Sequence, residues 1–359
     1  MNKRINYIDN LRWMTVSLLI IFHAAVAYNT WGEINYIYIK RVKPIASIVT
    51  FIEPWFMPLM FLLAGVSSFY SLKKRGYSAF MRERLLRLGI PLLFGLLVLS
   101  PVLSYIADLT HNGFNGGFFN HYRIYFSRFT DLTGYDGGFT LGHLWFVFIL
   151  LIISLISCVI IRLVDSIPEK KRKTAVNIIG VLLSVAATAT FDIKYFGKPL
   201  IMFLCVYLLG YYHFSTRTFV TRLAKYKWIY VMLFLAASIA DVVLYIYETG
   251  FKLLNTVCYY ASFALGIIAL VSLAHDYLDF SNRFTAFNTK ISYVFYIIHF
   301  PTVILCQYVL SLTHMNCIAN FILTVLITYP LTYGLSFIIE KTKVIRVLFG
   351  LKAVKSRKK

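Results

Sequence analysis

Histidine and arginine side chains within apolar segments are the residues of this sequence best suited to chemistry. His23 lies inside the first long apolar run, and Arg12 comes eleven positions before it. At about 100° per residue, eleven helical steps complete three turns with roughly 20° left over, so both side chains lie on one helix face, roughly 16 Å apart. An imidazole there can act as a general base, and the guanidinium can bind an anion. The alternative is an arginine that extends to water and a histidine that packs against a neighbouring helix.

A second group of arginines follows the second apolar run. Arg84-Leu85-Leu86-Arg87 places two guanidinium groups on one face of a helix, with Arg82 close by. Guanidinium forks suit planar, bidentate binding of phosphate, and both nucleotides and cytosolic acyl donors carry phosphates. The alternative is that these residues only fix the orientation of the chain in a membrane.

Two further histidines stand at or inside apolar runs. His143 occurs in Gly142-His143-Leu144-Trp145, where a polar loop enters such a run. His299 follows Tyr296 on one helix face, and Pro301 removes a backbone hydrogen bond just beyond it. The pattern predicts a bend at His299. The alternative for both histidines is a packed imidazole beside an interfacial aromatic residue.

The acidic residues complete the set of candidates. Glu53 lies in the second apolar run at a predicted depth close to that of His23, where a carboxylate can fix the tautomer of an imidazole. Asp241 lies in a later run, and Glu340 closes the last one. The alternative for Glu340 is a helix-end carboxylate that pairs with a neighbouring cation such as Lys341.

The composition defines the elements that must position these residues. Of 359 residues, 59% are hydrophobic and 14% are charged, which excludes a soluble enzyme, a disordered chain and a disulfide scaffold. We expect an all-α, polytopic membrane protein in the cell membrane. About ten transmembrane helices are predicted: 13–31, 45–69, 89–107, 143–164, 174–191, 197–213, 228–247, 253–273, 291–312 and 317–339. The pair 174–191 and 197–213 is the shortest.

The distribution of basic residues predicts the orientation. The net charge is +21, with 36 basic residues. In a soluble protein such a charge would suggest binding to nucleic acid. Here the basic residues lie between apolar runs. If both termini are cytosolic, only eight basic residues fall outside: Lys40, Arg41, Lys43, Arg123, Arg128, Lys194, Lys198 and Lys252. This asymmetry favours both termini in the cytosol, with the lipid bilayer as partner and no nucleic acid.

The domain organisation is expected to be simple. Residues 1–351 form one transmembrane domain, and 352–359 form a basic cytosolic tail. The start, with Lys3, Arg4 and Ala25-Val26-Ala27, also imitates a secretory signal. Cleavage there would spoil the charge pattern, so we expect the segment to remain as the first span.

The longest segment between spans, 108–142, has seven glycines among many aromatic residues. Loops of this length are usually functional or disordered, and the aromatic content makes pure disorder less favoured. Two readings remain: an interfacial lid on the bilayer, or a wall of an outward-facing substrate cleft.

The absence of several known motifs limits the kinds of reaction that we expect. The sequence has no HExxH, no Cys/His cluster, no Walker loop and no GxSxG, so we expect no metal, and the five cysteines are predicted to be free thiols. Intramembrane histidines and carboxylates also suit a proton-coupled transporter or a flippase of a glycan or amphiphile. A transporter usually has related halves, and no internal repeat is visible. A sensory or scaffolding protein would not need arginines leading to a buried histidine.

The sequence resembles the acyltransferase-3 family of bacterial integral-membrane acyltransferases, and within it the branch with the periplasmic-glucan succinyltransferases. The segments that carry the resemblance extend in family order from residue 7 to about 351: Tyr7-Ile8-Asp9-Asn10-Leu11-Arg12 with His23, Phe61-Leu62-Leu63-Ala64-Gly65, Arg84-Leu85-Leu86-Arg87 with Gly89-Ile90-Pro91, His143-Leu144-Trp145-Phe146, Tyr296-Ile297-Ile298-His299-Phe300-Pro301, Glu340 and Leu348-Phe349-Gly350. The usual Ser-Gly of the second span reads Ala64-Gly65 here, which leaves no hydroxyl at that position.

The resemblance implies a ten-span acyltransferase that takes acyl-CoA from the cytosol and acylates a hydroxyl or amine of an extracytoplasmic glycan or glycolipid. Acetyl and succinyl are the leading acyl groups. It implies that His23 is catalytic, that Arg12, Arg84 and Arg87 bind the donor, and that Glu340 is important. We therefore expect His23, Glu53, His143 and His299 in catalysis, and Arg12, Arg84, Arg87, Glu340 and Tyr296 in donor binding. His143, His299 and Tyr296 are also candidates for stabilising the oxyanion.

Overall fold

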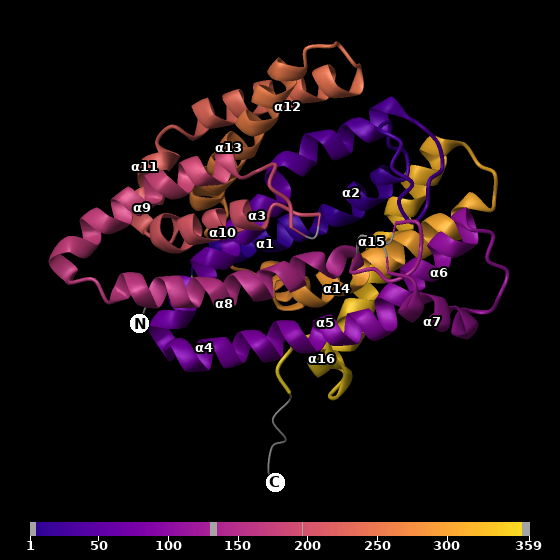
Figure 1. Ribbon diagram of the computed structural model, residues 1–359, viewed down its shortest axis with the longest axis horizontal. Coiled ribbons are helices and arrows are strands. Elements are labelled where there is room, and N and C mark those ends of the chain that lie inside the picture. Colours follow the sequence, from indigo (N-terminus) through magenta and orange to yellow (C-terminus); the bar gives the residue numbers. More distant parts are fainter. Residues whose placement is uncertain (1–4, 130–134, 196, 354–359) are drawn as a thin grey trace, which may run out of the picture. The chain divides into compact units, whose positions relative to one another are not determined.

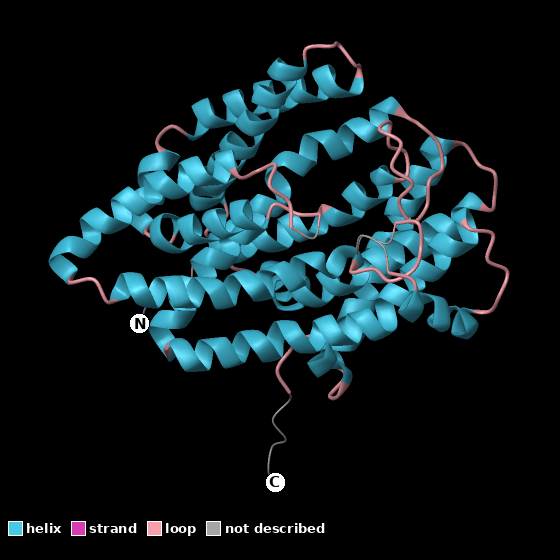
Figure 2. Cartoon of the chain, in the orientation of Figure 1, coloured by secondary structure: helices cyan, strands magenta, loops and turns pink. Residues whose placement is uncertain are grey.

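The computed structural model describes residues 5–129, 135–195 and 197–353. Its secondary structure over these residues is helical, without a named strand (Figure 2). Eight of the described helices are long and apolar enough to cross a membrane. The prediction of an all-α polytopic membrane protein is confirmed. Lys3, Arg4, Gly134 and positions 354–359 of the expected basic tail lie outside the described residues.

The two other predicted spans correspond to shorter helices. The first is divided into α1 (Asn6–Ser17) and α2 (Leu19–Val26), with a turn at Leu18 between them. The sixth is a shorter apolar helix, Leu200–Phe214, formed by α10 (Leu200–Leu209) and the π-helix η4 (Gly210–Phe214). The calculation that placed Arg12 and His23 on one face assumed one regular helix, so it stays a prediction.

The chain divides into two compact units. Their helices are labelled in Figure 1. Unit 1 comprises residues 1–15, 50–84 and 149–289, and unit 2 comprises 16–49, 85–148 and 290–359. Four helices contribute residues to both: α1, α3 (Lys43–Arg75), α8 (Trp145–Asp165) and α14 (Arg283–Ser311). Unit 1 also contains α4 (Tyr77–Arg84), α9 (Glu169–Ala189), α10, η4, α11 (Arg217–Ala224), α12 (Lys227–Ile246) and α13 (Lys252–Tyr277). Unit 2 also contains α2, η1 (Leu85–Gly89), α5 (Ile90–Phe94), η2 (Gly95–Leu99), α6 (Ser100–His111), α7 (Phe118–Ser127), η3 (Gly142–Leu144), α15 (Cys317–Lys341) and α16 (Ile345–Leu348).

Buried polar pairs fasten the apolar helices of unit 1. Helices α12 and α13 lie side by side (Figure 1), and Ser238 of α12 contacts Ser262 of α13 through their hydroxyl oxygens at 2.6 Å. Lipid tails are as apolar as the side chains of these helices, so the hydrophobic effect does not drive the helices together. Hydrogen bonds between small polar residues therefore help to hold membrane helices together.

In unit 2, one apolar cluster surrounds the middle of α14. It contains Phe300 and Ile304 of α14, Leu103 and Ile106 of α6, and Tyr36 from the loop after α2. Helix α15 begins after Asn316, whose side-chain oxygen accepts a hydrogen bond from the Ile318 amide at 2.8 Å and so satisfies one of the open donors at the helix start. The apolar cluster, which includes Phe300, holds the part of α14 that carries His299.

Candidate active site

Three histidines far apart in the sequence meet in unit 2. His23 of α2 and His143 of η3 each lie 5.3 Å from His299 of α14, measured between ring centroids. The Phe300 ring packs against both, at 4.2 Å from His23 and 5.4 Å from His143. His143 and His299 are buried, and His23 is partly buried. The structure thus brings together three of the four predicted catalytic residues.

A proline creates the hydrogen-bond acceptor for His143. Pro301 lies inside α14 and has no backbone N–H, so the carbonyl four residues earlier, that of Ile297, lacks its helical donor. His143 Nε2 lies 2.7 Å from this oxygen. A carbonyl oxygen only accepts, so Nε2 carries the hydrogen and Nδ1 keeps the lone pair in the neutral ring.

His299 has the opposite tautomer. Its Nδ1 lies 2.5 Å from the backbone oxygen of Tyr296 and therefore donates, which leaves the lone pair on Nε2. Within the described residues, neither His299 Nε2 nor His143 Nδ1 has a hydrogen-bond partner. Unsatisfied buried polar atoms are uncommon, and here both are basic nitrogens of one cluster.

Tyr296 supports this arrangement from α14. Its hydroxyl donates to the backbone oxygen of His143, and its ring lies 5.7 Å from those of His143 and His299. The predicted role of Tyr296 in donor binding is not tested by these contacts. Together with the bond from His143 to Ile297, the Tyr296 hydrogen bond holds η3 and His143 against α14.

Two of the predicted donor-binding arginines meet consecutive residues of α3 in unit 1. Arg12 Nη2 donates to Ser67 Oγ and, at 3.2 Å, to the backbone oxygen of Leu63. Arg84 Nη2 donates to Ser68 Oγ at 2.8 Å. The two guanidinium groups are therefore held by neighbouring serines. These serines were not among the predicted site residues, although they come two and three positions after Gly65.

Ser68 has all its hydrogen-bonding capacity in use. Its hydroxyl donates to the Ala64 carbonyl at 2.9 Å and accepts from Arg84 and, at 2.6 Å, from the Tyr207 hydroxyl. Arg12 has an acidic partner as well, with Asp9 Oδ1 at 3.2 Å from Nη1. The positions of both arginines thus depend on α3.

The helix around Arg87 differs from the expected one. Arg84 ends α4, whereas Arg87 lies in η1, a π-helical segment with a wider turn. The regular α-helical spacing that placed Arg84 and Arg87 on one face therefore does not apply. That geometric expectation and the proposed role of Arg87 therefore stay predictions.

Two of the acidic candidates, Glu53 and Asp241, belong to unit 1. Glu53, on the unit 1 part of α3, has an exposed side chain and interacts electrostatically with Asp241. Asp241 is buried, and its Oδ1 accepts from Asn255 Nδ2 at 2.6 Å. The pairing of Glu53 with His23 stays a prediction.

Glu340 is buried in unit 2 at the end of α15, with Lys290 Nζ at 2.6 Å and Arg346 Nη1 at 3.9 Å. It is the last of six buried polar residues spaced four apart along α15: Asn320, Thr324, Thr328, Thr332, Ser336 and Glu340. Of these residues, only Glu340 was predicted from the sequence as a site residue. Their constant spacing of four residues was the available signal, since an i+4 row can follow a neighbouring helix.

The fold and the site define an all-α membrane protein with a histidine cluster in one unit and a serine-held arginine pair in the other. Over the described residues, no group of three His, Cys, Asp or Glu side chains is placed to hold a metal ion. The acyltransferase domain of the acyltransferase-3 family matches residues 5–341, so the chain belongs to this family. No curated protein and no solved structure matches the chain. The protein is therefore a membrane acyltransferase.

Proposed function

We propose that the protein transfers an acyl group, acetyl or succinyl, from acyl-CoA to a hydroxyl or amine of an extracytoplasmic glycan or glycolipid. The family supports acyl transfer. The observation that carries the rest is the cluster of His23, His143 and His299, with two basic nitrogens lacking partners among the described residues.

In this mechanism His23 is the general base. The acceptor oxygen, or nitrogen in an amine, attacks the thioester carbonyl carbon while its proton passes to the His23 imidazole. The carbon–sulfur bond then breaks, and the CoA thiolate leaves and takes up the proton. The acceptor gains the acyl group as an ester, or as an amide where the acceptor is an amine.

His143 and His299 bind the acceptor in this proposal. Their N–H groups are already donated to backbone oxygens, so each ring offers a substrate only a lone pair. Two such lone pairs near His23 suit an acceptor that brings its own hydrogens, as a sugar with neighbouring hydroxyl groups does. The Tyr296 hydroxyl hydrogen is engaged too. Other groups would therefore supply the donors to the oxyanion.

Donor binding is assigned to the arginines of unit 1. Arg12 and Arg84 on neighbouring serines of α3 present two cations suited to the phosphates of CoA. Arg87 and Glu340 are further proposed contacts or supports for the donor.

The test is release of CoA thiol by purified protein given acetyl-CoA or succinyl-CoA. We expect His23→Ala to reduce the rate by about 100-fold or more, as loss of a general base does. His314→Asn is the matched control, because His314 is exposed in a left-handed turn where asparagine is tolerated. A folded His23→Ala protein with the wild-type rate would exclude His23 as base. Movement of a glycan or amphiphile without thiol release would instead favour the transporter.

A further inference from the structure

Helix α7 is a short helix next to the end of a membrane-spanning helix. It follows α6, which closes the candidate span Tyr77–His111, and it packs against α6. With 10 residues it is about 15 Å long, half the thickness of a bilayer core, so it cannot span a membrane. Its place in the chain therefore puts it near the membrane surface at this end of α6.

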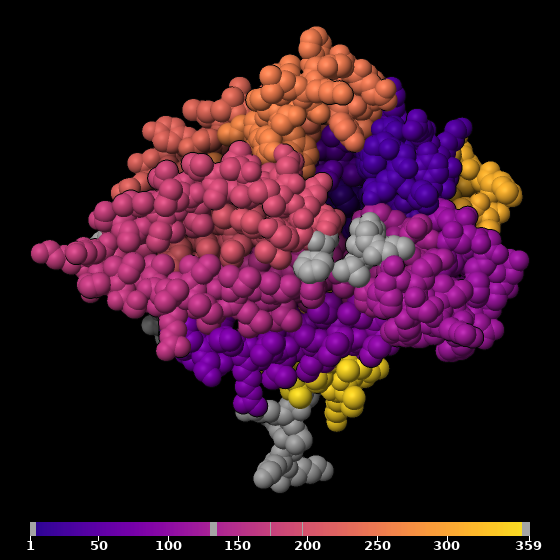
Figure 3. All heavy atoms as spheres, viewed as in Figure 1, coloured from indigo at the N-terminus to yellow at the C-terminus, as the bar shows by residue number. Residues whose placement is uncertain are grey.

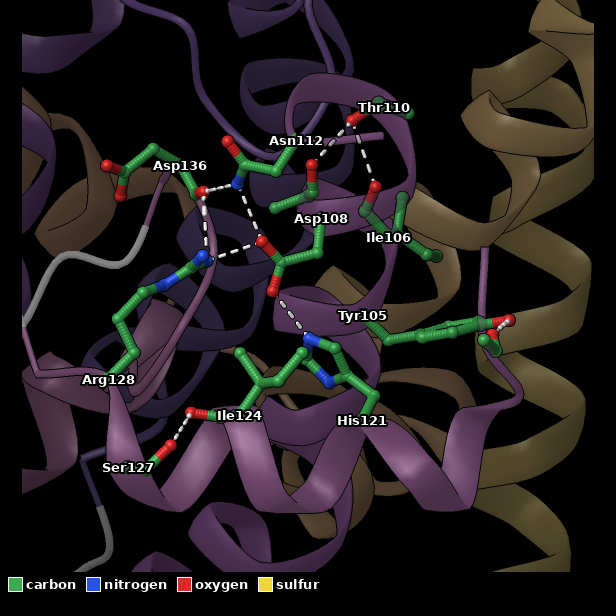
Figure 4. Close-up of polar contacts among 12 residues, drawn as sticks. Tyr105, Ile106, Asp108, Thr110, Asn112, His121, Ile124, Ser127, Arg128 and Asp136 are labelled. Atoms are coloured by element: carbon green, nitrogen blue, oxygen red, sulfur yellow. Dashed lines mark hydrogen bonds and ion pairs between the residues drawn. The ribbon is translucent and has the colours of Figure 1, made fainter. Parts of the chain in front are cut away.

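A buried carboxylate fixes the orientation of α7. Asp108, in the last turn of α6, contacts His121 Nε2 at 2.5 Å through Oδ2 (Figure 4). Its Oδ1 accepts from Arg128, directly after α7, and from Asn112 at 2.6 Å. Asp108 and His121 are both fully enclosed, at 1% and 0% exposure. Charge-assisted contacts to a buried carboxylate are among the stronger polar interactions in proteins.

Tyr125 adds a second attachment on the same side of α7. Its hydroxyl donates to the Leu96 carbonyl of η2 at 2.9 Å. Burial raises the pKa of Tyr125, so the hydroxyl keeps its hydrogen at physiological pH. The face of α7 with His121 and Tyr125 thus points into unit 2, and the opposite faces are fixed outward.

The outward surface of α7 has two distinct sectors. At about 100° per residue, Phe119, Tyr122 and Phe126 fall within roughly 60° of one another beside the buried face. Arg123, Ser127 and Asn120 follow in the next sector, within about 60°. The helix therefore presents, in order, an anchored face, an aromatic face and a polar face with arginine at the boundary.

The aromatic face is open to the surroundings at its two phenylalanines, whereas Tyr122 between them is half-buried and its hydroxyl donates to the Leu97 carbonyl at 3.2 Å. Phe119 is 84% exposed and Phe126 is 47% exposed, and Phe129 just beyond the helix is 60% exposed. The segment lies on the surface seen in Figure 3, in magenta. The rings of Phe119 and Tyr122 stack at 6.4 Å, and Tyr122 lies 6.2 Å from Phe126, so they form a continuous row.

We propose that α7 is an interfacial helix whose exposed rings, Phe119 and Phe126 on either side of Tyr122, insert among the lipids of the leaflet in which α6 ends. Aromatic rings favour the headgroup level of a bilayer, and Arg123 at the edge of the row can reach lipid phosphates. The polar sector then faces water. The occupant is lipid because the row continues the membrane surface that α6 reaches. This inference does not depend on the proposed acyl donor or acceptor.

The test places the photo-crosslinking residue benzoylphenylalanine at Phe119 or Phe126, and in matched variants at Asn120 or Ser127. Each full-length protein is reconstituted in vesicles of phosphatidylcholine and phosphatidylglycerol, irradiated and weighed intact by mass spectrometry. A variant at Leu93, which is 63% exposed on α5, provides the signal of a lipid-facing position within a span.

We expect lipid adducts at Phe119 and Phe126 to be several-fold more abundant than at Asn120 and Ser127. All four sites are on the surface, so the variants are expected to fold, which gel filtration in detergent checks. Equal adducts at all four sites, or none at Phe119 and Phe126 while Leu93 gives a signal, would overturn the proposal. So would a crosslinked dimer at Phe119 or Phe126, because a second copy would then cover this face.

Discussion

His143 Nε2 donates to the Ile297 carbonyl at 2.7 Å, the backbone oxygen that Pro301 leaves without a helical donor. A residue that lacks an N–H thus determines where a histidine from another segment binds. The bond also fixes the tautomer of His143, since the donating nitrogen must carry the hydrogen. The position of His143 therefore depends on the backbone of α14 around Pro301.

Replacing Pro301 with alanine tests this relationship. Pro301→Ala supplies an amide that can bond the Ile297 carbonyl and compete with His143. Loss of a hydrogen bond worth about 1 to 1.5 kcal/mol corresponds to roughly ten-fold in rate. We expect acyl transfer to fall by about that factor, with thermal stability kept or raised. Pro330→Ala in α15 is the control, because Pro330 is also mid-helix but exposed. Equal activity in both variants would contradict the role of Pro301.

The two tautomers predict which amide substitutions preserve the fold. Glutamine places its amide near Nε2 of a histidine, and asparagine places its amide near Nδ1. His143→Gln and His299→Asn therefore keep the donors to Ile297 and Tyr296 and remove the lone pairs on Nδ1 and Nε2. We expect both proteins to fold normally and to lose most of their thiol release with the acceptor present.

The reversed pair, His143→Asn and His299→Gln, separates structure from chemistry. These variants lose the bonds to the backbone, so we expect lower melting temperatures than for the first pair. If the first pair retains full activity, the lone pairs of His143 and His299 have no part in the reaction.

Ser68→Ala tests whether α3 positions Arg84. The substitution removes the hydroxyl that accepts from Arg84 and Tyr207. A lost hydrogen bond to a charged group, about 1.5 kcal/mol, predicts an acyl-CoA KM roughly ten-fold higher, with kcat changed less. Ser78→Ala on α4 is the control, since Ser78 is exposed. An unchanged KM in Ser68→Ala would mean that Arg84 is held by other contacts or does not bind the donor.

Asp108→Asn tests the attachment of α7. An amide keeps the shape of the side chain but removes the charge that His121 and Arg128 contact. We expect the free energy of unfolding to fall by about 2 kcal/mol, seen as a lower melting temperature in detergent. Asp136→Asn is the control, because its side chain is exposed and only its backbone oxygen joins the network. Equal melting temperatures would show that the Asp108 charge does not hold α7.

The helical membrane fold could be predicted because apolar run length is a local property of the sequence. The histidines could be found because an ionisable residue in such a run is costly and so stands out. Their meeting could not be predicted, since His143 and His299 come from segments far apart in the chain. The tautomers depend on Pro301 in a way that only the three-dimensional contact reveals. Likewise, Ser67 and Ser68 look ordinary until Arg12 and Arg84 reach them.

Some features of the structure could not be foreseen from the local pattern. The π-helical turn at Arg87 adds a residue that a regular helical count does not foresee. The segment 108–142 contains helix α7, although its glycines and aromatic residues were read as a loop, because Asp108 anchors it from α6. In both places a tertiary contact or an irregular turn prevailed over the local pattern.

The packing around Gly65 explains why the motif Ala64-Gly65 needs a glycine. A Cβ at Gly65 would overlap the Tyr207 carbonyl, and one at Gly210 would overlap the Leu62 carbonyl. Both neighbours are backbone atoms, which cannot turn aside, so α3 and the helix formed by α10 and η4 must approach closely. We expect Gly65→Ala to lower the free energy of unfolding by more than about 2 kcal/mol, because an added atom forces the helices apart. The change would be measured as a lower melting temperature. Gly334→Ala in α15 is the matched control: nothing lies near its Cβ position, and alanine favours a helix by up to about 1 kcal/mol. A Gly65→Ala protein as stable as Gly334→Ala would mean that this close packing does not exist.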